Sequence, residues 1–197
     1  MKNLPMAYMM MAAGYGEDEI RKAEKMMETV SADNKFEPQE VNIGTFKFET
    51  MDSRDIRNIT LGDCNRSCMR IGECAESCIA DAIGNPESAL VAISTEGKVC
   101  GHSWVRTGRS GRIYMDNIET CKEYEKSEEL AEAVIDWSMM IGKRHGTDVV
   151  IGAAHFLPMT DRANQFMSQD DYMDEFEGDT YSDLSKEAVL IIRKAKT

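Results

Sequence analysis

The stretch that most constrains the fold is residues 97–146, where two candidate strands precede one long helix. Residues 99–106 and 112–120 predict strands joined by a hairpin loop at 107–111. Residues 127–144 carry an apolar face at helical spacing, with Ser127 as a candidate N-cap and Gly146 as a candidate terminator. A hairpin followed by a crossover helix predicts a sheet with helices packed on it.

The remaining elements extend this pattern on both sides. The predicted helices are residues 16–30, 73–83 and 160–167, and the predicted strands lie in 41–51, 89–94, 148–154 and 188–192. This order predicts an α/β (α+β) fold with a mixed, mainly antiparallel sheet flanked by helices. With 197 residues, the chain fits an N-terminal arm and helix over 1–40 and one larger domain over 41–197.

The charge and composition restrict the function classes. The formal net charge of −12 argues against general nucleic-acid binding, which needs a basic surface, but it fits docking on a basic protein. Residues 170–179 predict an acidic, solvated loop. No apolar run reaches the ~18–20 residues of a membrane span, and the N-terminal run at 4–13 makes a poor signal peptide. We therefore expect a cytoplasmic, acidic protein whose six cysteines are mostly thiols.

Two segments within residues 97–146 carry a family resemblance. They are the strand at 114–120 and the helix start at 126–131, which reads Lys-Ser-Glu-Glu-Leu-Ala. Together with the element order, they make residues 47–194 resemble the GNAT superfamily of N-acetyltransferases. That family has the pattern Gln/Arg-x-x-Gly-x-Gly/Ala at this turn. Lys126 and Ala131 match its ends, while Glu129 stands at the middle glycine, next to Glu128.

The resemblance implies an acyl donor, acetyl-CoA or another acyl-CoA. Its pantetheine arm would pair with the strand at Ile118 and Thr120. Its pyrophosphate would bind the helix start at Lys126, Ser127, Leu130 and Ala131, because backbone N–H groups at a helix start attract anions. The glutamates at this turn would repel phosphate.

Acidic residues in the second strand are the candidate general bases. The resemblance implies that an acid here deprotonates an acceptor amine, and strand alternation places Asp116 and Glu119 on opposite faces, so one should point to the acceptor. The alternative is a strand end with solvated acids. Counting back across the hairpin loop pairs Arg106 with Arg112, Trp104 with Tyr114 and His102 with Asp116. Such a His–Asp pair would raise the pKa of His102 and make it a base, or would be a half-exposed ion pair.

The cysteine-rich segment offers further candidates. Cys64, Cys68, Cys74 and Cys78 lack the spacing of common zinc or iron–sulfur sites, so we expect no metal and take Cys74 and Cys78 as core residues of a helix; a cysteine-metal module is the alternative. Arg66 and Arg70, in the polar loop around Cys68, are candidate substrate-binding residues, or surface arginines.

Two residues further along are candidates because of their place in the resembled fold. Tyr172 lies near the position where the family often has a tyrosine that protonates the leaving thiolate. His155 follows the strand at 148–154 and is either part of the transfer centre or structural.

Two function hypotheses follow. The first is a GNAT-like acyltransferase that moves an acetyl or other acyl group from a CoA-type donor to an amine on a small molecule or a protein. The second is a non-catalytic acidic interaction or inhibitor protein on the same scaffold, bound to a basic partner. The sequence leaves the oligomeric state open.

Overall fold

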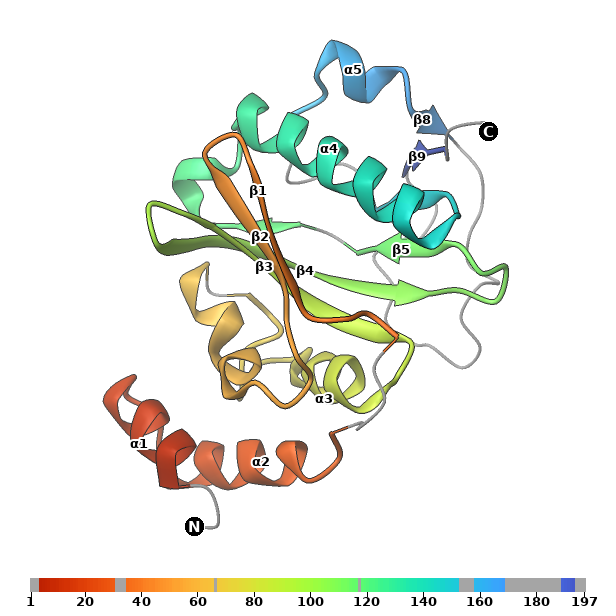
Figure 1. Cartoon of the computed structure of the whole chain (residues 1–197). Helices are drawn as coiled ribbons and strands as arrows, with labels where there is room; N and C mark the ends of the chain where they lie inside the picture. Colours follow the sequence, from red (N-terminus) through yellow and green to blue (C-terminus); the bar gives the residue numbers. More distant parts are fainter. Residues whose placement is uncertain are drawn as a thin grey trace.

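The computed structural model describes residues 4–30, 35–65, 67–116, 118–152, 158–168 and 189–193. Within them, one sheet runs in the order β1-β2-β3-β4-β5-β7-β9-β8, and β6 pairs with β4 beside this path. The pairings are antiparallel except β5 with β7. Helices cover both faces of the sheet (Figure 1). The mixed, mainly antiparallel fold class is thereby confirmed.

The helices are α1 (Leu4–Ala12), α2 (Glu17–Met27), α3 (Glu76–Gly84), α4 (Glu128–His145) and α5 (Asp161–Asn164), with 3-10 helices η1 (Ile56–Cys64) and η2 (Lys122–Tyr124). The strands are β1 (Gln39–Ile43), β2 (Phe46–Thr50), β3 (Ser88–Thr95), β4 (Lys98–Thr107), β5 (Ile113–Met115), β6 (Glu119–Thr120), β7 (Val149–Ile151), β8 (Met167–Ser168) and β9 (Val189–Ile192).

The strand predicted within 41–51 is confirmed as β2, and a strand that was not predicted, β1, pairs with it as a hairpin. Gly44 has φ 58° at the turn, in the left-handed region that glycine adopts without strain. Ile43 then pairs with Phe46, and the register continues to Gln39 opposite Thr50. The N-terminal arm also differs from expectation, since α1 is a helix.

The strongest sequence signal, the helix after the hairpin, is confirmed. The Ser127 side chain accepts a hydrogen bond from the Leu130 amide at 3.1 Å, which satisfies one of the N–H groups left unpaired at a helix start. Gly146 ends the helix in the left-handed conformation, with φ 65°. The helix crosses over the sheet and brings β7 parallel to β5. The division of the chain at residue 40 stays a prediction.

Two apolar cores lie on the two faces of the sheet. The first packs α4 on the sheet, where the rings of Phe48 and Trp137 stack with centroids 5.7 Å apart. The second packs α1, α2, α3 and η1 against the opposite face, where Leu90, Ala92 and Trp104 meet them. Figure 1 shows α4 and α5 on one side of the sheet and α1 to α3 on the other. No helix in the described ranges is long and apolar enough to cross a membrane.

The Phe48–Trp137 stack gives a test of the first core. Phe48→Ala should lower the free energy of unfolding by about 3–5 kcal/mol, because it removes a fully buried ring and leaves a cavity. Urea denaturation measures this. Met11→Ala, at a methionine that is 55% exposed, is the control and should change stability by less than about 0.5 kcal/mol. Equal losses in the two variants would contradict this packing.

Candidate functional site

The second strand of the central hairpin is interrupted. Its first part, β5, pairs with β4 so that Met115 faces Val105, and its second part, β6, pairs so that Glu119 faces His102. From Val105 to His102 is three residue steps on β4, whereas Met115 to Glu119 is four steps on the partner (105 − 102 = 3; 119 − 115 = 4). One extra residue on one side of an antiparallel pair is a β-bulge.

The predicted hairpin register is therefore wrong. Arg106 lies opposite Tyr114 rather than Arg112, and His102 lies opposite Glu119 rather than Asp116. The hairpin loop lies one residue later than predicted, since pairing begins at Thr107 and Ile113 and the Gly108 amide donates to the Arg112 carbonyl. This moves the register by two residues, and the bulge then adds one more.

The bulge also places both candidate acids on one face of the sheet. Side chains of directly paired residues lie on the same face, so Glu119 shares the face of His102. The Asp116 carboxylate lies 3.7 Å from the guanidinium of Arg106, four positions from His102 on β4 and thus on that same face. The expectation that Asp116 and Glu119 take opposite faces is wrong, because an extra residue reverses the alternation.

Asp116 is held inside a buried polar cluster. The Arg106 guanidinium lies over the ring of Trp104, 4.4 Å from its centroid, and also approaches Asp116. The Ser103 hydroxyl donates to the Asp116 carbonyl at 2.8 Å. Asp116 is 6% exposed, whereas Glu119 is only half-buried. Of the two acids, Glu119 is the one that a molecule in solvent can reach.

His102 is in a different state from the one predicted. Its side chain is 1% exposed, and neither ring nitrogen has a hydrogen-bond partner in the described part of the chain. Burial lowers the pKa of His102 to about 4, because the charged imidazolium loses its hydration. The predicted rise of this pKa beside Asp116 is wrong, and the imidazole is neutral at pH 7.

A slot opens where the interrupted strand leaves β7. The parallel pairing ends with Met115 opposite Ile151, and the Gly152 amide still donates to the Met115 carbonyl at 2.8 Å. Beyond this point β6 pairs with β4 instead. The slot is lined by Ile118, Ala131, Val134, Ile135, Ile151, Gly152, Pro158, Met159, Ala163 and Leu190.

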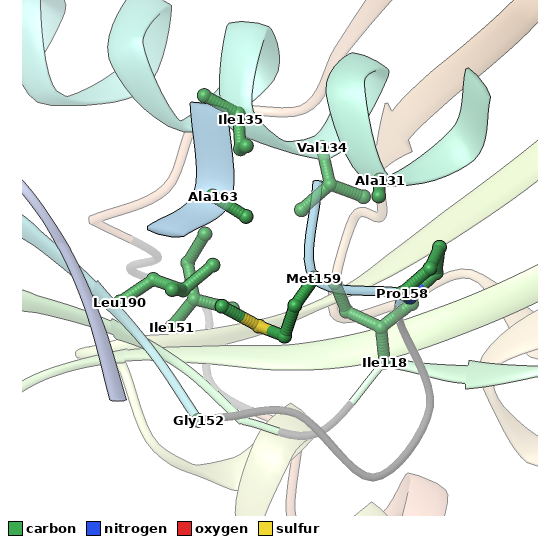
Figure 2. Close-up of a pocket in the computed structure, with 10 residues that line it drawn as sticks. All are labelled: Ile118, Ala131, Val134, Ile135, Ile151, Gly152, Pro158, Met159, Ala163 and Leu190. Atoms are coloured by element: carbon green, nitrogen blue, oxygen red, sulfur yellow. The ribbon is translucent and has the colours of Figure 1, made fainter. Parts of the chain in front are cut away.

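The slot is narrow in this structure. In Figure 2 the Met159 side chain extends between Ile151 and Ile118. The remaining cavity measures about 10 Å³. That is roughly the room of a single water molecule, so the slot admits an extended chain only if Met159 moves.

The turn at the start of α4 lies near the slot, since Ala131 lines it. The Ser127 hydroxyl accepts from the Leu130 amide, and the Ser127 carbonyl accepts from the Ala131 amide at 3.0 Å, so these N–H groups are already paired. The Glu129 carboxylate accepts from the Thr45 hydroxyl at 2.8 Å. This acidic, internally bonded turn disfavours the binding of a pyrophosphate.

Comparison with known proteins bears on the fold. No protein-family model matches the sequence, and no curated protein does. An acetyltransferase from Streptococcus agalactiae has a TM-score of 0.50 at 12% identity, over 77% of this chain and 99% of that one. Tetrahymena GCN5 has a TM-score of 0.50 at 10% identity, over 82% of this chain and 99% of that one.

The chain has a GNAT-like fold. A GNAT family acetyltransferase from Elizabethkingia anophelis, solved with acetyl-CoA bound, also matches, with a TM-score of 0.45 at 8% identity over 77% of this chain and 99% of that one. At these identities the likeness establishes the architecture alone.

The other residues predicted for the GNAT-like site are dispersed. Ile118 lines the slot and Thr120 pairs with Gly101 of β4. Lys126 is exposed at the turn, and the Leu130 side chain is fully buried in the core. Gly101 marks the close approach of β6, because a Cβ there would lie 3.0 Å from the Glu119 carbonyl oxygen.

Arg70 belongs to a network that joins the α1–α2 turn to η1. Its Nε donates to Asp63 at 3.0 Å, and the Tyr15 hydroxyl donates to the same carboxylate. The pKa of Tyr15 rises to about 12 through burial and then through Asp63. The role of Arg70 in substrate binding stays a prediction. Arg66, His155 and Tyr172 lie outside the described residues.

The cysteines that lie close together in the structure differ from those that lie close together in the sequence. Cys78 is buried in α3 as expected, but Cys74 is exposed ahead of the helix, so its core assignment is wrong. Cys64 instead meets Cys121, with the Cys121 thiol 2.9 Å from the Cys64 carbonyl oxygen. Because these residues are far apart in sequence, no local spacing could have paired them.

The state of His102 predicts a pH dependence of stability. Its pKa is about 4 in the folded chain and about 6.5 in the unfolded chain, so the unfolded state binds more protons between these values. The free energy of unfolding is therefore highest above pH 6.5 and falls as the pH is lowered, because His102 is protonated more readily in the unfolded chain. The loss is roughly 2–3 kcal/mol at pH 4.5. Denaturant unfolding from pH 7 to 4.5 should show His102→Leu with a flatter profile than wild type. Parallel profiles would contradict this.

Proposed function

We propose that the chain is a GNAT-like acyltransferase that moves an acyl group from a thioester donor of the CoA type to an amine. The observation that supports this proposal is the bulge between Met115 and Glu119. It separates β6 from β7, and so opens the apolar slot lined by Ile118 and Ala131. The same bulge places both acids on the opposite face of the sheet from α4. This arrangement supports a donor on one side and an acceptor on the other.

Glu119 is the proposed general base. It is half-buried and lies across from the imidazole of His102. Because that imidazole is neutral, it forms no ion pair with the Glu119 carboxylate. Its carboxylate accepts the proton of the acceptor amine as the amine attacks the thioester carbonyl and forms the new C–N bond. The C–S bond then breaks, and the leaving thiolate takes up a proton to give the free thiol. A backbone N–H of the interrupted strand, near Ile118, donates to that carbonyl oxygen as negative charge develops.

Asp116 has a positioning role in this proposal. It is buried beside Arg106, and Arg106 is fixed in turn by Trp104. A carboxylate held in this way keeps its place, which maintains the geometry of the bulge next to Glu119. The acceptor is an amine on a small molecule or a protein.

Substitution of the base tests the acceptor side. Glu119→Gln should lower kcat by about 10²-fold or more with little change in the KM for the donor, since only proton transfer is lost. The assay follows release of the free thiol from acetyl-CoA with a panel of primary amines at pH 8. Glu123→Gln, at an exposed acid after β6, is the matched control and should keep wild-type activity. Full activity in Glu119→Gln would remove Glu119 from the mechanism.

A substitution in the turn at the start of α4 tests the binding of the donor. Glu129→Gly removes a charge beside the site expected for pyrophosphate and frees the backbone for close approach, so acetyl-CoA should bind about 5- to 10-fold more tightly, as measured by calorimetry. S-acetyl-pantetheine, which lacks the diphosphate, should bind wild type and variant equally. A larger gain for S-acetyl-pantetheine than for acetyl-CoA would contradict the repulsion argument.

The non-catalytic alternative is favoured by one observation. Glu123, Glu125, Glu128 and Glu129 are all exposed around the helix start, which is a surface for a basic partner rather than for phosphate. The same calorimetry separates the two functions. Binding of neither acetyl-CoA nor S-acetyl-pantetheine to wild type or Glu129→Gly would set the transferase aside and leave the interaction protein.

A further inference from the structure

Three cysteines from separate parts of the chain converge where β4 begins and β6 ends. Cys64 closes η1, Cys100 lies in β4 and Cys121 follows β6 directly. The Cys121 thiol lies 2.9 Å from the Cys64 carbonyl oxygen and 3.8 Å from that of Val99. The Cys121 amide donates to the Cys100 carbonyl at 2.8 Å. The convergence joins the two faces of the sheet at this corner.

The Cys121 thiol packs against the Cys64 backbone, and the two thiols interact. The pKa of Cys64 rises to about 12, first through burial and then through the charge of Cys121 and a hydrogen bond between the two thiols. Both residues are half-buried, so a small molecule can reach the pair. The Cys64 thiol is therefore protonated at neutral pH, and the pair remains reduced unless an oxidant is supplied.

Cys100 lies near this pair but is less accessible. It is 2% exposed within the core under α4, and its thiol donates to the Ile93 carbonyl at 3.4 Å. Within the described ranges, no group of three or more His, Cys, Asp or Glu side chains is arranged to hold a metal ion. The chemistry open to the Cys64–Cys121 pair is therefore thiol–disulfide exchange.

We propose that Cys64 and Cys121 form a reversible intramolecular disulfide by exchange with a low-molecular-weight disulfide. The Cys121 thiolate attacks one sulfur of the reagent, forms a mixed disulfide and releases the first reagent thiolate. The Cys64 thiolate then attacks the Cys121 sulfur and releases the second. The two protons lost by the cysteines end on the two released thiols, so the protein pair is oxidised and the reagent is reduced.

The bond would connect the end of η1 with the segment that follows Glu119. Cys64 ends the 3-10 helix on the α1–α3 face, and Cys121 lies two residues after Glu119 and leads into the turn before α4. A link between them closes the chain segment 64–121 and restricts the unfolded state, so the oxidised protein should unfold at a higher temperature. The proposal does not require transferase activity, and its readouts do not use it.

The test is oxidation of the purified full chain with oxidised glutathione, followed by blocking of remaining thiols and non-reducing peptide mapping. We expect a Cys64–Cys121 linked peptide, a chain about 2 Da lighter in the fraction free of glutathione adducts, and a midpoint of thermal unfolding raised by roughly 10 °C. Dithiothreitol should reverse all three changes.

Matched serine variants locate the bond. Cys64→Ser and Cys121→Ser should each lose the linked peptide and the thermal shift, whereas Cys100→Ser and Cys74→Ser should keep both. Circular dichroism of the reduced variants verifies that each is folded, and having both Cys64→Ser and Cys121→Ser guards against one failing to fold. A bond from Cys121 to Cys100, glutathione adducts without an internal bond, or an unchanged shift in Cys64→Ser would each overturn the proposal.

Discussion

One extra residue in the strand between Met115 and Glu119 determines the organisation of the site. Before it, the strand is shared between β4 and β7, and after it the chain pairs with β4 alone. The lost pairing with β7 costs backbone hydrogen bonds in a buried region, and such a cost is tolerated where the packing around it is strong. Here the Ile118 side chain fills part of the gap beneath α4, and the Arg106–Asp116 pair holds the opposite face.

The two faces of the sheet are chemically unlike at this point. The α4 side is apolar, with Ile118, Ala131 and Ile151 around the slot. The opposite side contains His102, Arg106 and Asp116, all nearly excluded from solvent. Charged groups that are buried need partners, and the stacking of Arg106 on Trp104 together with its approach to Asp116 supplies them. A sheet with an apolar slot on one face and ionisable groups on the other suits a reaction whose two substrates differ in polarity.

The sequence predicted the parts of this fold that depend on local chemistry. The α4 helix was predictable because Ser127 and Gly146 mark its ends and its apolar face has helical spacing. The hairpin turn at Gly44 and the bulge were not, since alternation over a short run reads the same in one strand as in two. Asp116 and Glu119 were found as candidates, but their common face follows from the bulge. The Cys64–Cys121 contact depends on the tertiary fold alone.

The hydrogen bond from Thr45 to Glu129 couples two elements that the chain order keeps apart. Thr45 lies at the tip of the β1–β2 hairpin, at one edge of the sheet, and Glu129 lies in the first turn of α4. The helix start therefore has a mechanical tether to the sheet edge. Any molecule that displaces the first turn of α4 must either break this tether or pull the hairpin tip with it, so occupancy at the helix start would be transmitted to the margin of the sheet.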